Sequence, residues 1–154
     1  MANRKAPVGI IHSFNFGIIP REGILIMNYS ADEAVAALNK IKAYDWAGAV
    51  AFKKKDFDKG QWLGGAVELM DKNRNVKGTA YYIYIPEKFN FSDFHQIKLA
   101  HEAEHVVNFV SKEAFDRVKE YEFSAYLLSH ITAQCLNLMR GMGPNKGVSY
   151  CLDK

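Results

Sequence analysis

The chain has 154 residues, of which 49% are hydrophobic and 24% charged, and its formal net charge is +3 at pH 7. This length and balance predict one compact domain over residues 1–154 and exclude a linker, a repeat or a low-complexity tract. No segment is apolar for long enough to span a membrane, and polar residues interrupt the first apolar run, so we expect no signal peptide and a cytoplasmic location.

The first predicted elements are two strands. A strand over residues 8–18 is expected to form a hairpin with a strand over residues 23–29, and Pro20-Arg21-Glu22 is expected to form the turn.

A helix and three further strands are predicted next. Ser30 and Glu33 have the spacing of a capping box, which predicts a helix from this point to about Tyr44. Hydrophobic patterning then predicts strands over residues 47–54, 61–70 and 77–86.

Residues 101–105 read His-Glu-Ala-Glu-His and lie within a segment that has the pattern of an amphipathic helix. Ser92 and Asp93 are candidate N-caps, and no Pro or Gly interrupts residues 89–140. The apolar residues expected to face the core recur at three- and four-residue intervals: Phe94, Ile97, Ala100, Ala103, Val107 and Val110.

A second helix is predicted from Lys112 or Ala114 to Met139, with Gly141 after its end. Together the elements predict an α+β fold, in which a small antiparallel sheet carries an N-terminal helix and two C-terminal helices. The two C-terminal helices would hold the residues of the motif.

Histidines four residues apart on a helix lie on one face, so His101 and His105 can bind one metal ion together. Imidazole nitrogens are typical zinc ligands, and Glu102 projects to the side of the pair, where a general base would stand. The sequence therefore predicts a Zn²⁺ site with Glu102 as the base. The alternative is a surface helix that matches the His-Glu-x-x-His pattern by chance.

Glu122 is the candidate third zinc ligand. Sixteen residues separate it from His105, which is enough chain to finish one helix, turn and bring a second helix back. Glu120 is its rival, because helix phase is uncertain by two residues. An ordinary solvated glutamate is the alternative reading of Glu122.

Tyr126 and His130 follow Glu122 by one and two helical turns and are candidate catalytic residues that would stabilise an oxyanion. Tyr126 can equally be a core aromatic residue. His130 can equally donate a structural hydrogen bond to a carbonyl group or to a ligand carboxylate.

The two elements His-Glu-x-x-His and Glu-x-x-Ala-Tyr resemble small zincin-like proteins encoded by bacteriophages and prophages, which are similar to minimal metallopeptidases with a glutamate ligand (gluzincins). The close resemblance covers residues 97–132. It implies that His101, His105 and Glu122 are zinc ligands and that Glu102 is the catalytic base. It also implies that a strand beside the cleft pairs with an extended substrate, a role open to residues 79–86; an internal strand is the alternative.

The leading functional hypothesis is therefore a zinc-dependent hydrolase of the metallopeptidase type, with a peptide or protein as substrate. The competing hypothesis is a phage accessory or virion-associated protein in which zinc only joins two helices. A nucleic-acid partner rests solely on Lys53-Lys54-Lys55, for which a solvated hairpin end is the favoured interpretation.

Overall fold

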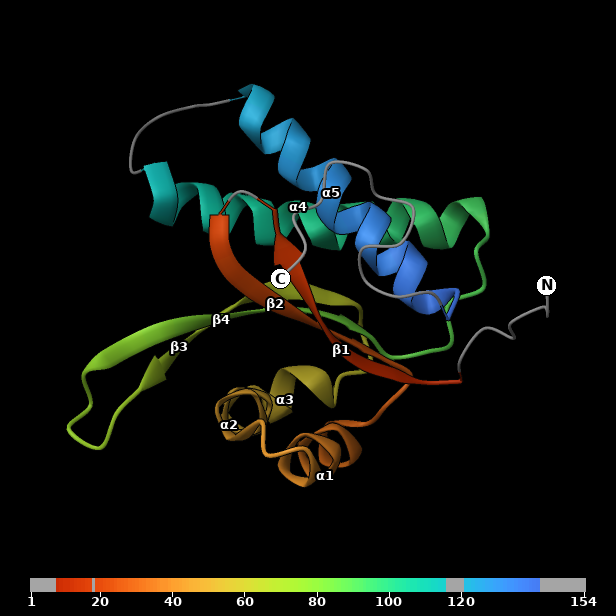
Figure 1. The fold of residues 1–154 in the computed structure, drawn as a ribbon. Helices are drawn as coiled ribbons and strands as arrows, with labels where there is room; N and C mark the ends of the chain where they lie inside the picture. Colours follow the sequence, from red (N-terminus) through yellow and green to blue (C-terminus); the bar gives the residue numbers. More distant parts are fainter. Residues whose placement is uncertain (1–7, 18, 116–120, 142–154) are drawn as a thin grey trace.

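The computed structural model describes residues 8–17, 19–115 and 121–141, with the side chains of residues 113–115, 121 and 122 left out of the description. The described chain has an α+β fold in which an open sheet separates two groups of helices (Figure 1). The strands are β1 (Ile10–Phe16), β2 (Ile19–Met27), β3 (Leu63–Met70) and β4 (Val76–Ile85). The helices are α1 (Ala31–Lys40), α2 (Tyr44–Phe52), α3 (Lys54–Phe57), α4 (Asp93–Phe115) and α5 (Tyr121–Met139).

The sheet is mixed, with the strand order β1-β2-β4-β3. β1 pairs with β2 and β3 pairs with β4 in the antiparallel sense, whereas the central strands β2 and β4 are parallel. The expectation of a purely antiparallel sheet is therefore wrong at its centre. The physical reason is that the chain passes through α1, α2 and α3 after β2, so the β3–β4 hairpin returns with β4 along β2.

The two central strands are buried on both faces. Leu25 and Ile83 belong to the hydrophobic cluster under α4 and α5, whereas Ile26 and Tyr84 belong to the cluster under α1, α2 and α3. Strands covered on both sides read as continuous apolar runs, as residues 80–85 do. Residues 79–86 are thus an internal strand, and β3 is the edge strand beside α4.

The first hairpin turns earlier than expected. The strands β1 and β2 meet around Gly17, which has a left-handed φ of 69°, while Pro20-Arg21-Glu22 lies within β2. Prediction placed the turn on the Pro-containing segment, but glycine adopts this backbone conformation at no steric cost.

The capping box at the start of α1 is confirmed. The backbone N–H of Glu33 donates to Ser30 Oγ at 3.1 Å, and the Ser30 N–H donates to Glu33 Oε1 at 2.8 Å. The helix ends at Lys40, a few residues before the predicted end at Tyr44.

Residues 47–54 were expected to form a strand but belong to α2 and the start of α3. Their apolar run consists mainly of alanine, the strongest helix former, and not of β-branched residues. Ala47 and Val50, one helical turn apart, are buried against the sheet. This correction places a helix beside the β3–β4 hairpin.

The motif helix α4 extends to Phe115, so Lys112 and Ala114 belong to it and do not open the second helix as predicted. The end of α5 at Met139 is confirmed, and Gly141 follows with φ 77°. Both helices cover the same face of the sheet, as Figure 1 shows, and α1, α2 and α3 cover the other.

The backbones of the sheet and α4 approach each other closely at Gly64 in β3. A Cβ atom added to Gly64 would overlap the backbone carbonyl group of Glu102. Gly64 and Gly65 do not form a β-bulge, because both residues keep the regular register and the irregularity lies between Leu69 and Met70. Gly64 instead allows the backbone of the motif helix to touch the edge strand.

A second tie joins the beginnings of β3 and α4. The Trp62 Nε1–H donates to Glu87 Oε2 at 2.9 Å, and His95 Nε2 lies 3.6 Å from the other oxygen of that carboxylate. His95 Nδ1 accepts the Asn90 N–H at 3.1 Å. The imidazole is thus held by its neighbours on both nitrogen atoms.

Substituting Gly64 by alanine is expected to lower the free energy of unfolding by about 2 kcal/mol or more, because the added methyl group would overlap the rigid backbone of Glu102. Gly78→Ala in β4 is the matched control, since an added Cβ there meets no atom within 4 Å. Urea unfolding of both variants checks this expectation. Equal stabilities would contradict the close approach.

Candidate metal centre

His101 and His105 lie one turn apart near the middle of α4, and both are exposed. Their Nε2 atoms are 3.2 Å apart and their ring planes are nearly perpendicular, at 86°. The same separation fits a hydrogen bond between the two rings when one Nε2 carries the proton. The helix thus directs two imidazole nitrogens toward one point in solvent.

This separation can be compared with that of two ligands on one zinc ion. Two nitrogen atoms bound at about 2.0–2.1 Å and at a tetrahedral angle lie about 3.3–3.4 Å apart. The observed 3.2 Å is close to that separation, so the spacing of the two nitrogen atoms suits zinc. The donor set fits the metal that the sequence predicts.

Glu102 completes the cluster. One ligand atom from each of His101, Glu102 and His105 lies within 4.8 Å of the other two, and Glu102 is only 7% exposed. The backbone of this residue is the part of α4 that rests on Gly64. The carboxylate is therefore placed by the sheet, while the imidazoles on either side of it face solvent.

The face of α4 that carries the histidines is more apolar than predicted. Phe94 and Ile97 were expected in the core stripe, but they are 66% and 68% exposed. The helix instead buries Leu99, Ala103, Val106, Val107 and Val110 against the sheet and α5. The physical reason is helix phase: at 100° per residue, Phe94 and Ile97 share the sector of His101 rather than that of Leu99.

Tyr82, which the sequence does not single out, lies on the sheet face opposite α4, in the cluster under α1, α2 and α3, and is linked to the site electrostatically. Its hydroxyl group lies beside Gly65, where an added Cβ would be 3.0 Å from Oη. Burial raises the pKa of Tyr82, and the carboxylates of Asp56 and Glu102 raise it further. The cross-strand pairing of Tyr82 with a glycine was the available signal, but it needs the register of the sheet.

Glu122 lies in the first turn of α5, but its side chain lies outside the described residues, and so does the whole of Glu120. The nearest described tie between the two helices is Ser111 Oγ to Ser124 Oγ, at 3.3 Å. Ser111 is six residues beyond His105, which is about 9 Å along the helix axis. Ligation by Glu122 stays a prediction.

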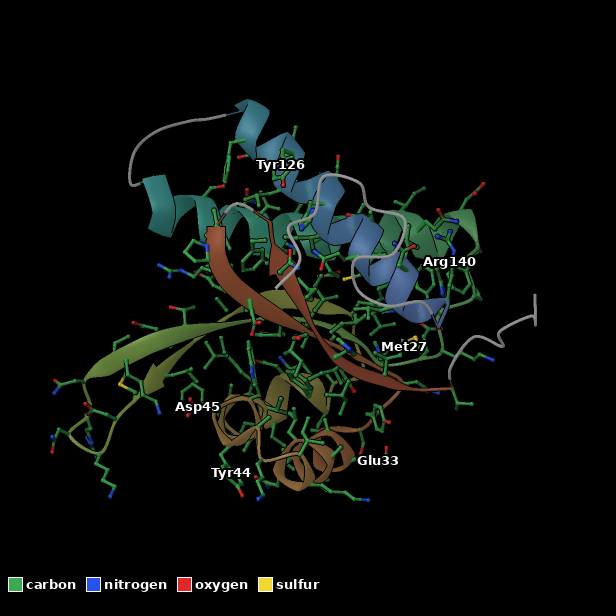
Figure 2. The ribbon with its side chains drawn as sticks, in the orientation of Figure 1. Met27, Glu33, Tyr44, Asp45, Tyr126 and Arg140 are labelled. Carbon is green, nitrogen blue, oxygen red and sulfur yellow. The ribbon has the colours of Figure 1, made fainter. Side chains whose placement is uncertain are left out.

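Tyr126 and His130 contact each other, and His130 also contacts β1. Their rings stack at 5.6 Å, and the fully buried His130 donates from Nε2 to Asn15 Oδ1 at 2.8 Å. Gln134 adds two hydrogen bonds to the backbone of Asn15. Figure 2 shows Tyr126 on the upper part of α5. Among the described residues, the donor cluster around His101 does not include His130.

The run Lys53-Lys54-Lys55 lies at the junction of α2 and α3, not at a hairpin end. Its lysines face carboxylates: Lys54 contacts Asp58 at 2.5 Å, and Lys53 is 3.9 Å from Asp56. Local acidic side chains therefore balance much of this charge.

Comparisons of the chain with models of protein families, with curated proteins and with solved structures give no match. Within the described ranges, no helix combines the length and hydropathy needed to cross a membrane.

The stability of the protein is expected to fall below about pH 6.5. Burial lowers the pKa of His130, so the unfolded chain binds a proton near its ordinary pKa of about 6.5 while the folded chain does not. The loss starts there and continues down to the lowered pKa of the folded state.

Urea unfolding at several pH values checks this expectation. His130→Gln keeps a donor for Asn15 and should reduce the pH dependence, whereas His12→Gln, at an exposed position, should not. An unchanged pH profile in His130→Gln would contradict the assignment.

Proposed function

We propose that this protein is a zinc-dependent hydrolase that cleaves peptide bonds. The observation that supports the proposal is the pair of His Nε2 atoms, 3.2 Å apart, with the Glu102 carboxylate in the same cluster. The two imidazoles are exposed, so a substrate has access to them. A site of this composition suits metal-assisted hydrolysis.

When bound there, a zinc ion supplies Lewis acidity, which lowers the pKa of a bound water and polarises a carbonyl group. Glu102 accepts the proton of the attacking water and then passes it to the leaving amine. Its partial burial beside Gly64 orients the carboxylate toward the histidines. His101 and His105 hold the ion.

The edge strand beside the site favours a peptide as the substrate. β3 is the last strand of the described sheet, and it packs on the motif helix at Gly64. The unpaired N–H and C=O groups of an edge strand can form a ladder with any extended backbone. We therefore propose that β3, and not residues 79–86 as expected, pairs with an extended substrate.

The second candidate function is a phage accessory or virion-associated protein whose zinc site is structural. The observation that favours it is the position of the Glu102 carboxylate, which is close enough to the histidines to act as a third ligand. A glutamate that binds the metal cannot also serve as the base. The phage or prophage setting and the cytoplasmic location rest on the resemblance of the motif and on the sequence.

Zinc content distinguishes the ligand sets. Freshly purified protein is expected to hold about one zinc per chain by elemental analysis, and His105→Ala and Glu122→Ala should each lose most of it. His12→Ala, which removes an exposed histidine elsewhere, is the control and should keep the metal. If Glu122→Ala keeps zinc while Glu102→Ala loses it, Glu102 is the third ligand and the catalytic proposal fails.

Glu102→Gln separates binding from catalysis. It should keep zinc and reduce hydrolysis of a fluorescein-labelled unfolded protein by about 100-fold or more, because the general base is lost. Glu104→Gln changes an exposed glutamate of the same motif and should leave the rate unchanged. Parallel losses of zinc and activity in Glu102→Gln would argue against its role as a base.

A further inference from the structure

Four large apolar side chains that are exposed to solvent meet at one groove. Tyr44 and Phe52 come from α2, Met70 from β3 and Phe109 from α4, with exposures between 47% and 78%. We call this the α2–β3 groove; its volume is about 850 Å³. Apolar side chains from separate elements that gather around one hollow mark a binding surface. Figure 2 shows Tyr44 and Asp45 on α2, at one wall of the groove.

The groove continues the face of α4 that carries the candidate metal centre. Phe109 lies four residues after His105, and Lys112 lies seven residues after His105. Both therefore lie on the same side of the helix as the histidines. Both side chains line the groove. Phe94 and Ile97 are exposed before the histidines on this face.

β3 and α4 run side by side in the same direction. Gly64 touches α4 at Glu102, and farther along both elements Met70 and Phe109 line the groove together. Six residues of strand lead from Gly64 to Met70, a distance of about 20 Å. The β3 residues that line the groove run from Ala66 to Met70, so an extended chain laid along β3 would pass the metal centre first and reach the groove two to six residues later.

The chemistry of the groove indicates an apolar strand as its occupant. Lys77 is paired with Asp45 at 2.9 Å, and Lys53 faces Asp56 at 3.9 Å, so the charges at the rim largely cancel. Within the described chain, the backbone pairs of β3 are all with β4, which leaves its outer edge for another backbone. Main-chain hydrogen bonds would give affinity, and the groove would select the side chain.

On this basis we infer that the α2–β3 groove binds a bulky apolar side chain of an extended polypeptide, two to six residues from the bond presented to His101 and His105. The inference rests on the proposed function for the identity of the reacting bond, but binding in the groove needs no metal. The polypeptide class follows from the free strand edge, and the preference for apolar side chains follows from Phe52, Met70 and Phe109.

The test uses two fluorescein-labelled ten-residue peptides, one with phenylalanine at alternate positions and one with serine there. Anisotropy is measured on the full chain carrying Glu102→Gln, with zinc and after chelation. The phenylalanine peptide should bind at least about tenfold more tightly in both cases. Because binding does not depend on zinc, a failure of the metal proposal would leave this result unchanged.

Matched variants assign the binding to the groove. Phe52→Ser and Phe109→Ser should each weaken binding of the phenylalanine peptide by about fivefold or more. Ile41→Ser, at a side chain that is 65% exposed and does not line the groove, should have no effect. Circular dichroism checks that all three variants keep the fold.

Three results would overturn the inference. The first is equal affinity for the two peptides, and the second is unchanged affinity in both phenylalanine variants. The third is a dimer in sedimentation experiments that Phe52→Ser dissociates, because the groove would then be an interface between two copies of the chain.

Discussion

The contact between Gly64 in β3 and the backbone of Glu102 in α4 is the interaction on which the arrangement of the site depends. A helix normally packs on a sheet through side chains, which keep the two backbones well apart. Here the absence of a side chain on one residue brings the motif helix against the edge strand. The Trp62–Glu87–His95 tie connects the beginnings of the same two elements.

This contact gives the three residues of the cluster different surroundings. Glu102 is buried because it lies on the side of α4 that meets β3, while His101 and His105 stay exposed. A carboxylate in a confined environment next to solvent-facing imidazoles is a useful arrangement for proton transfer, since its orientation is set before a substrate arrives. The apolar groove extends the same interface between strand and helix.

The sequence predicts correctly those features that depend on residues close together in the chain. The capping box of Ser30 and Glu33, the end of α5 near Gly141, and the helix carrying His101 and His105 all depend on residues within one or two turns. The sequence does not predict features that depend on which distant segments pair in the sheet. The parallel β2–β4 pair, the edge position of β3 and the placement of Tyr82 beside Gly65 depend on contacts between distant segments. The apolar run at residues 47–54 forms a helix and not the expected strand, because hydrophobic periodicity alone does not separate a short buried helix from a buried strand.

The hydrogen bonds between Asn15 and the side chains of His130 and Gln134 have a consequence for the order of folding. They join residues more than a hundred positions apart, so α5 can dock on β1 only after the chain has been synthesised beyond Gln134. The imidazole pair, by contrast, requires only one turn of α4 to be helical. If zinc binds this pair as we propose, its first two ligands are in place as soon as α4 is helical, whereas a ligand from α5 joins only when that helix docks.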